Sequence, residues 1–297
     1  MLYFLVSKNF FKIEQMVINI IRKINDLKEL GKSGVRIPSI GFGTWGIGGG
    51  LTPDYSNDNY FINVIKKAVE LGMWHIDTAE MYGDGHAEEL VGKAIKAFDR
   101  EEVFITTKVR GENLSREKLL KAVKGSLTRL DVKYIDLYLI HWPNPRVPLK
   151  ETMKTLEELV DKGVIRFIGV SNFDVKLIEE ARTYLSKEDI VNVQNRYSLM
   201  YRGDERDVIP YCQREGITYT AYTPLEKGKL AKDKFLAKIG EKYDKTAAQV
   251  ALNWIIYQKN LITIPKASNL KHLEENAGAM GWRLDEEDFK KISNKFK

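Results

Sequence analysis

The chain has 297 residues, of which 43% are hydrophobic, so it is long enough to bury a sizeable core. Lysine and arginine outnumber aspartate and glutamate by 47 to 41, but basic and acidic residues are interleaved and no basic run contains spaced aromatic residues. This pattern argues against a nucleic-acid-binding face. The single cysteine, Cys212, excludes disulfides and thiolate metal clusters within the chain and indicates a reducing, cytoplasmic setting.

The N-terminal residues 1–6 are apolar, but they lack a basic flank and the run is too short for a signal peptide or a membrane span. Met16 offers an alternative start, so we expect residues 1–15 to be an extra N-terminal segment and residues 16–297 to form one domain. Four scattered histidines show no metal-ligand spacing, and no metal site is expected. The high lysine and glutamate content is compatible with a thermophilic source.

Short β-branched or aromatic runs recur eight times along the chain. They cover residues 40–44, 74–78, 103–109, 134–142, 165–171, 190–197, 217–225 and 261–267. Amphipathic helix patterns lie between them, for example at residues 116–130 and 175–185. This alternation predicts an α/β fold, namely a single parallel (β/α)8 or TIM barrel. Residues 27–40, with Gly31-Lys32-Ser33-Gly34 between two short runs, predict a β-hairpin in front of it.

A glycine-rich stretch, Gly41-Phe42-Gly43-Thr44-Trp45-Gly46, matches the G-x-G-x-x-G fingerprint of dinucleotide-binding domains. That fingerprint requires a helix to begin within the motif, so that its N-terminus meets the pyrophosphate. The following residues 47–53 include three glycines and a proline and do not predict a helix. The match therefore does not indicate a Rossmann domain.

Polar and aromatic residues collect where the expected strands end. They are Thr44, Asp77, Lys108, His141, Ser171, Asn172, Gln194, Tyr222 and Lys266. Each of them alone has an ordinary structural explanation, such as a solvated lysine or a core aromatic residue. In a (β/α)8 barrel, however, the C-terminal strand ends face one common site, so these residues together predict a functional cavity.

Several of these stretches resemble the aldo-keto reductase superfamily, over essentially the whole chain from about Leu27. The main matches are Gly43-Thr44-Trp45, residues 75–83 (HIDTAEMYG), Leu139-Ile140-His141-Trp142-Pro143 and Gly169-Val170-Ser171-Asn172-Phe173. Val193-Gln194-Asn195, residues 221–225 (AYTPL) and Ile264-Pro265-Lys266 follow in order. Within the superfamily, Glu226-Lys227-Gly228 and Lys266-Ala267-Ser268-Asn269 look most like archaeal alcohol dehydrogenases.

The resemblance implies a catalytic tetrad of Asp77, Tyr82, Lys108 and His141, and an enzyme that interconverts aldehydes or ketones and alcohols with NAD(P)H. Tyr82 would be the general acid or base. An ammonium favours a nearby phenolate, so we expect Lys108 to lower the pKa of Tyr82. Asp77 would form an ion pair with Lys108, and His141 would orient the carbonyl oxygen.

The resemblance also implies a cofactor site. Ser171, Asn172 and Gln194 would bind the nicotinamide carboxamide, and Tyr222 would stack on the nicotinamide ring. Thr44 would lie near the ribose, and the backbone around Thr223 and Leu225 would lie near the pyrophosphate. Lys266 and Ser268 would bind the phosphate, and Glu275 and Asn276 would bind the adenine. His272 stands where NADPH-specific members usually have an arginine. We therefore expect NADH and NADPH both to work, with modest discrimination.

The resemblance makes Trp45 and Trp142 apolar walls of the substrate pocket. Arg110 either attracts substrates with anionic or hydroxylated tails or is a solvated loop residue. The segment at residues 143–150 is short and no long C-terminal tail follows, which predicts an open pocket with broad tolerance for aldehydes, ketones and sugars. The chain is expected to be a monomer or weak dimer without nucleic-acid or membrane partners.

Two other functions remain as alternatives. A non-catalytic regulatory or binding subunit could use the same barrel, because fold alone does not define activity. A phosphosugar-binding barrel would share the phosphate site, but it would not account for Asp77, Tyr82 and His141 together.

Overall fold

A two-stranded antiparallel hairpin precedes the barrel in the computed structural model, which describes residues 26–297. Its strands are β1 (Leu27–Glu29) and β2 (Arg36–Pro38). Eight parallel strands follow: β3 (Phe42–Gly43), β4 (His75–Asp77), β5 (Phe104–Val109), β6 (Ile135–Ile140), β7 (Ile165–Ser171), β8 (Ile190–Arg196), β9 (Thr218–Tyr222) and β10 (Leu261–Thr263). The expected hairpin and the eight expected strands are thus confirmed.

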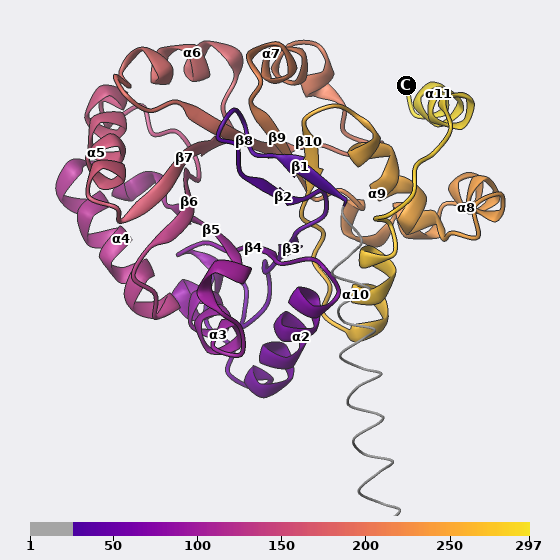
Figure 1. Ribbon diagram of the computed structural model, residues 1–297, viewed down its shortest axis with the longest axis horizontal. Helices are drawn as coiled ribbons and strands as arrows, with labels where there is room; N and C mark the ends of the chain where they lie inside the picture. The colour runs from indigo at the N-terminus through magenta and orange to yellow at the C-terminus, as the bar shows by residue number, and fades with distance from the viewer. Residues whose placement is uncertain (1–25) are drawn as a thin grey trace, which may run out of the picture.

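The sheet curls until its two edge strands meet. Strands are ordered from β3 to β10 as in the sequence, and Ile40, just before β3, forms a parallel bridge with Thr263 of β10. Gly41 N donates to Thr263 O at 2.8 Å and Gly43 N to Pro265 O at 3.3 Å. Figure 1 looks along the resulting barrel, with the hairpin drawn across its opening. The architecture is the predicted (β/α)8 barrel.

Helices cover the outside of the strands (Figure 1). They are α2 (Asp58–Glu70), α3 (His86–Ile95), α4 (Arg116–Leu130), α5 (Leu149–Asp161), α6 (Val175–Thr183), α7 (Val208–Glu215), α8 (Lys234–Glu241), α9 (Ala247–Tyr257), α10 (Leu270–Ala277) and α11 (Glu286–Lys295). The capping box predicted at the start of α9 is present: Thr246 and Gln249 exchange side-chain and backbone hydrogen bonds. No helix begins in the glycine-rich stretch at residues 41–46; the next one is α2.

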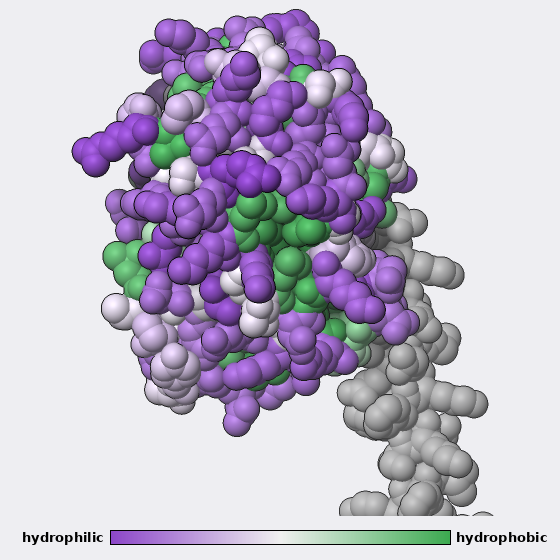
Figure 2. Space-filling model, turned by 90° about the vertical axis from the view of Figure 1, so that its left-hand side faces the viewer, coloured by the Kyte–Doolittle hydropathy of each residue, from purple (hydrophilic) through white to green (hydrophobic). Residues whose placement is uncertain are grey.

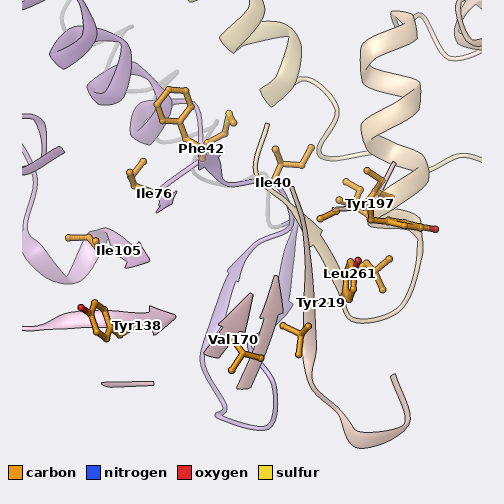
Figure 3. Close-up of a cluster of buried hydrophobic side chains, with 14 of the residues drawn as sticks. Ile40, Phe42, Ile76, Ile105, Tyr138, Val170, Tyr197, Tyr219 and Leu261 are labelled. Atoms are coloured by element: carbon orange, nitrogen blue, oxygen red, sulfur yellow. The ribbon is translucent and has the colours of Figure 1, made fainter. Parts of the chain in front are cut away.

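Side chains of each strand alternate between two cores, as the strand period of two requires. Ile76, Ile105 and Tyr138 belong to the layer between strands and helices, which Figure 3 shows. Phe104 and Leu137 belong instead to a second cluster, in which Leu30 and Ile37 of the hairpin also pack. The hairpin therefore closes the N-terminal end of the barrel, and the polar strand ends face the opposite mouth.

Three observed strands end two or more residues earlier than predicted. The runs expected at residues 134–142, 217–225 and 261–267 stop as strands at Ile140, Tyr222 and Thr263. Thr223 adopts a left-handed backbone with φ of +57°, and Pro224 and Pro265 have no N–H for a ladder. The residues after these strands therefore belong to the loops of the barrel mouth.

The outer surface is mostly polar. Figure 2, a view onto the left-hand side of Figure 1 where α5 lies, shows hydrophilic residues over most of this face and a small apolar area near its centre. Within residues 26–297, no helix is long and apolar enough to span a membrane. The segment predicted at residues 1–15 lies outside the described residues.

Candidate active site

Asp77, Lys108 and Tyr82 form one buried hydrogen-bonded group at the ends of β4 and β5. Lys108 is fully buried, and its Nζ lies 2.5 Å from Asp77 Oδ1, 2.8 Å from the backbone oxygen of Thr78 and 3.3 Å from the Tyr82 hydroxyl. Asp77 and Lys108 lie on adjacent parallel strands and point into the barrel. The ion pair predicted between Asp77 and Lys108 is confirmed.

Burial dominates the electrostatics of this group. It raises the pKa of the Tyr82 phenol above the ordinary value, although Lys108 opposes the increase. The sign expected for the Lys108 contribution was therefore right, but the expected net lowering was wrong, because the phenol is nearly enclosed. Burial alone would lower the pKa of Lys108, but the interactions of Lys108 with Asp77 and Tyr82 together outweigh burial and raise it. Lys108 thus stays an ammonium while Tyr82 stays a neutral phenol at neutral pH.

His141 follows β6 and lies beside this group, with its ring centroid 5.7 Å from that of Tyr82. Burial, then Lys108 and Arg110, lower its pKa to about 2, so the imidazole is neutral. Its Nδ1 is buried and has no hydrogen-bond partner among the described residues. An unpaired acceptor costs less than an unpaired N–H donor, so the neutral ring carries its proton on Nε2.

Trp45 and Trp142, which were predicted to line the substrate pocket, lie against Tyr82 and His141. The Trp45 ring packs edge-on against Tyr82, with centroids 5.0 Å apart, and Trp142 stacks on His141 at 3.9 Å. Trp45 is 48% exposed and Trp142 is 42% exposed. Large apolar rings so accessible beside buried polar groups form a surface on which a small organic molecule can pack.

Arg110 contacts the turn that carries Tyr82, which neither of the two sequence-based alternatives anticipated. One guanidinium nitrogen donates to Asp84 Oδ1 at 2.6 Å, and the Arg110 backbone N–H donates to Glu80 Oε1 at 2.6 Å. Sequence reasoning missed Glu80 and Asp84, although both stand within two residues of Tyr82. The placement of one acidic residue two positions before Tyr82 and another two positions after it was the sequence pattern that could have indicated them.

Of the three residues predicted to bind the carboxamide, Gln194 and Asn172 are hydrogen-bonded to tetrad residues, and Ser171 is bonded to Gln194. Gln194 Nε2 donates to Asp77 Oδ2 at 2.8 Å, and Asn172 Nδ2 donates to the backbone oxygen of His141 at 2.8 Å. The Tyr222 hydroxyl donates to Asn172 Oδ1 at 2.7 Å, and the Ser171 hydroxyl to the backbone oxygen of Gln194 at 2.6 Å. Thr44 is buried and donates its hydroxyl to Asp77 O at 3.0 Å.

The positions predicted for the phosphate lie between β10 and α10, and those predicted for the adenine lie within α10. Lys266 reaches back towards Gly46, since a Cβ on that glycine would be 3.9 Å from Lys266 Nζ. Asn269 caps α10 by accepting a hydrogen bond from the His272 N–H, and its Nδ2 lies 3.0 Å from His272 Nδ1. Ser268 lies in the loop that precedes α10, and Glu275 lies in the last turns of α10. Thr223 and Leu225 follow β9 in a loop where Thr223 and Glu226 are both left-handed.

This donor set fits a dinucleotide. Asn276 is 2% exposed, yet its side chain has no hydrogen-bond partner among residues 26–297. Lys266 has no ion-pair partner in the same part of the chain, so an ammonium and a buried amide remain available for a phosphate and a base. The described residues contain no group of three or more His, Cys, Asp or Glu that could hold a metal ion.

A model of the aldo/keto reductase family matches residues 39–296. The chain belongs to this family. The match spans the whole barrel and includes every tetrad position, which the structure brings together at one mouth. The catalytic and cofactor roles of the individual residues stay predictions.

Curated relatives include methylglyoxal reductase YeaE of Escherichia coli strain K12. The two sequences are 36% identical over 251 residues, and the alignment covers 83% of this chain and 86% of the relative. Glyoxal reductase of Bacillus subtilis strain 168 is 38% identical over 262 residues, covering 88% of this chain and 89% of its own. The expected likeness to archaeal alcohol dehydrogenases is therefore corrected: these relatives are bacterial reductases.

Solved structures of aldo-keto reductases also resemble this chain. The thermostable aldo-keto reductase Tm1743, in complex with the inhibitor epalrestat, superposes with a TM-score of 0.87 at 47% identity, covering 90% of this chain and 98% of its own. An aldo/keto reductase from Klebsiella pneumoniae, in complex with NADP and acetate, has a TM-score of 0.81 at 32% identity and covers 90% and 94%.

Proposed function

We propose that the protein is an NAD(P)H-dependent carbonyl reductase that converts small aldehydes and ketones to alcohols. The observation that carries the proposal is the Tyr82 hydroxyl, held 3.3 Å from the Lys108 ammonium and beside His141 in a mouth flanked by two tryptophans. A neutral phenol next to a buried cation suits the delivery of a proton to a carbonyl oxygen.

Tyr82 acts as the general acid. Burial raises the pKa of its phenol, so the proton is present at neutral pH, and it passes to the carbonyl oxygen as negative charge develops there. The phenolate left behind faces the Lys108 ammonium, which stabilises it at low local dielectric. Asp77 keeps Lys108 charged and oriented.

His141 orients the substrate. Its imidazole is neutral, and with the proton on Nε2 it donates a hydrogen bond to the same carbonyl oxygen. A neutral donor leaves the positive charge of the site at Lys108, so it polarises the carbonyl without competing with Tyr82 as an acid. Trp45 and Trp142 pack against the apolar part of the substrate and exclude water from the reacting atoms.

The nicotinamide cofactor supplies the hydride when it is bound. Ser171, Asn172 and Gln194 are the residues that would bind its carboxamide, and Tyr222 would pack on the ring. Lys266 and Ser268 would hold the phosphate, and the unpaired Asn276 amide with Glu275 would hold the adenine. These assignments rest on the family resemblance and on the hydrogen-bonding groups that the chain leaves available.

The exposed tryptophans and the names of the relatives support the proposed substrate class. Curated relatives bear the names methylglyoxal reductase and glyoxal reductase, and we extend this chemistry to small 2-oxoaldehydes and related aldehydes here. Two tryptophans more than two-fifths exposed leave room for varied side groups, which favours broad rather than narrow selection. The reverse reaction, alcohol oxidation, uses the same groups with Tyr82 as base.

The test is oxidation of NADPH and NADH by the purified protein with methylglyoxal, glyoxal and 4-nitrobenzaldehyde. We expect Tyr82→Phe to lower kcat by ~10²–10⁴-fold, the usual contribution of a general acid, while cofactor affinity stays nearly unchanged. If the wild-type protein binds cofactor but turns over no carbonyl, a non-catalytic binding function replaces this proposal. If Tyr82→Phe keeps more than about a tenth of the activity, another proton donor is required.

A further inference from the structure

The turn that carries Tyr82 is bonded to the segment after β5 on both sides of the tyrosine. Glu80, two residues before Tyr82, accepts through Oε1 from the Arg110 N–H at 2.6 Å and from Asn113 Nδ2 at 3.0 Å. Asp84, two residues after Tyr82, accepts from the Arg110 guanidinium at 2.6 Å. The same guanidinium nitrogen lies 3.4 Å from the backbone oxygen of Glu80.

The turn needs such an external contact because its backbone is unfavourable. Gly83 has φ of +56° and Asp84 has φ of +50°, in a short 3-10 segment (Tyr82–Gly85). Residues other than glycine rarely adopt this left-handed conformation, so neighbouring contacts must hold Asp84 there. The Asp84 carboxylate is 67% exposed, and the Arg110 guanidinium is its ion-pair partner.

The contacts of Arg110 also link the segment that carries Lys108 to the turn that carries Tyr82. Lys108 is two residues before Arg110, and Tyr82 is flanked by the two acidic residues that Arg110 bonds. The Tyr82–Lys108 hydrogen bond itself is long, at 3.3 Å, and would not fix the phenol alone. A displacement of about 1 Å of a reacting group can cost a large part of catalysis.

We propose that Arg110, together with Glu80 and Asp84, is a positioning residue that holds the Tyr82 hydroxyl against Lys108 for proton transfer. This inference rests on the proposed carbonyl reductase function. It replaces both earlier views of Arg110, since a side chain bonded to the turn is neither simply solvated nor free for a substrate anion. Glu80 is 7% exposed and fixes the backbone of Arg110, so the contact is built from two sides.

The experiment compares Arg110→Met, Arg110→Lys and Asp84→Asn with the control Arg146→Met. Arg146 is exposed on the segment after β6, and its side chain has no hydrogen-bond or ion-pair partner among the described residues. Each variant is assayed with 4-nitrobenzaldehyde and with 4-carboxybenzaldehyde, which differ in charge. Cofactor affinity and melting temperature are measured alongside.

We expect Arg110→Met to lower kcat about tenfold or more for both aldehydes, with KM and cofactor affinity little changed. Arg110→Lys and Asp84→Asn keep one donor or one acceptor and should lose only about two- to fivefold. A weaker contact between Tyr82 and Lys108 also reduces the effect by which Lys108 lowers the pKa of the phenol, so that pKa rises further. The alkaline limb of kcat, with Asp77, Lys108 and His141 still facing Tyr82, should therefore move to higher pH in Arg110→Met only.

Two results would overturn the inference. If Arg110→Met raises KM for 4-carboxybenzaldehyde alone, Arg110 is a substrate contact. If its kcat matches that of Arg146→Met, the turn holds Tyr82 without help. Should Arg110→Met fail to fold, Asp84→Asn decides in its place, because Asp84 is exposed: an unchanged kcat would again reject the inference. Failure of the proposed function itself is separate, since wild-type protein would then show no carbonyl turnover.

Discussion

Gln194 and Asp77 are 117 residues apart in the chain, and Gln194 Nε2 donates a hydrogen bond of 2.8 Å to Asp77 Oδ2 across the barrel. Lys108 donates to the other oxygen of the same carboxylate at 2.5 Å. A charged carboxylate can remain in this interior because both of its oxygens are satisfied. Gln194 therefore supports the tetrad positions, whatever it does for a cofactor.

Replacing Gln194 with methionine should destabilise the cofactor-free protein. The variant leaves Asp77 Oδ2 buried without a donor, and hydrogen bonds to charged groups contribute ~1.5–3 kcal/mol. Urea unfolding measures the loss. The control Gln213→Met removes a partly exposed donor to a neutral carbonyl and should cost less than about 1 kcal/mol. An unchanged unfolding free energy with weakened NADPH binding would show that Gln194 serves the cofactor alone.

Lys108→Met should abolish activity and reduce stability together. It removes the ammonium that faces Tyr82 and leaves Asp77 without its ion-pair partner, which costs ~3–5 kcal/mol for a buried pair. The double variant Asp77→Leu with Lys108→Met removes both charges and should recover most of the stability, but no activity. Chemical unfolding and steady-state rates separate the two effects. An inactive Lys108→Met protein of wild-type stability would mean that Asp77 finds another partner.

The pH dependence of kcat should have an alkaline limb and no limb from His141. Tyr82 must be protonated to act as an acid. The kcat for reduction is therefore at its maximum below the pKa of Tyr82 and falls as the pH rises through that pKa. Burial raises that pKa above the ordinary ~10 of tyrosine, which places the loss at strongly alkaline pH. His141, with a pKa lowered to about 2, is neutral throughout. A limb near pH 6.5 that disappears in His141→Asn would contradict this assignment.

The fold and the tetrad cluster were accessible from the sequence because they depend on local patterns. A residue at the C-terminal end of a parallel barrel strand has to face the mouth, which places Asp77, Lys108 and His141 together. The hairpin and the Thr246 cap also follow from short motifs. These features need only the strand and helix periods and the order of the elements.

Other features depend on distances that no local pattern contains. The Arg110–Asp84 contact joins two loops and requires the left-handed turn at residues 83–84. The net rise in the pKa of Tyr82 follows from how completely the phenol is enclosed. A sequence shows that Lys108 is near Tyr82, but it does not show how much water reaches either group, so the sign of the net shift was missed.

We expect cofactor preference to depend on a contact between His272 and Asn269. Asn269 Oδ1 accepts the His272 N–H at 2.8 Å as the helix cap, which turns Nδ2 towards the ring at 3.0 Å from His272 Nδ1. The amide donates, so Nδ1 is an acceptor and only Nε2–H remains as a donor. A neutral ring with one donor binds a 2′-phosphate weakly, whereas an arginine would present a charged, two-pronged contact. Lys266 then supplies only a single ammonium.

Both NADPH and NADH should therefore support turnover, with modest discrimination. His272→Arg should shift the ratio of kcat/KM towards NADPH by ~1.5–3 kcal/mol, the contribution of a hydrogen bond to a charged group. His272→Gln keeps one neutral donor and should leave the ratio within about threefold, which makes it the matched control. Steady-state rates with each cofactor at fixed aldehyde concentration measure the ratio. A wild-type preference for NADPH above about 100-fold, ~2.7 kcal/mol, would refute the prediction, because one ammonium and one neutral imidazole would not provide it.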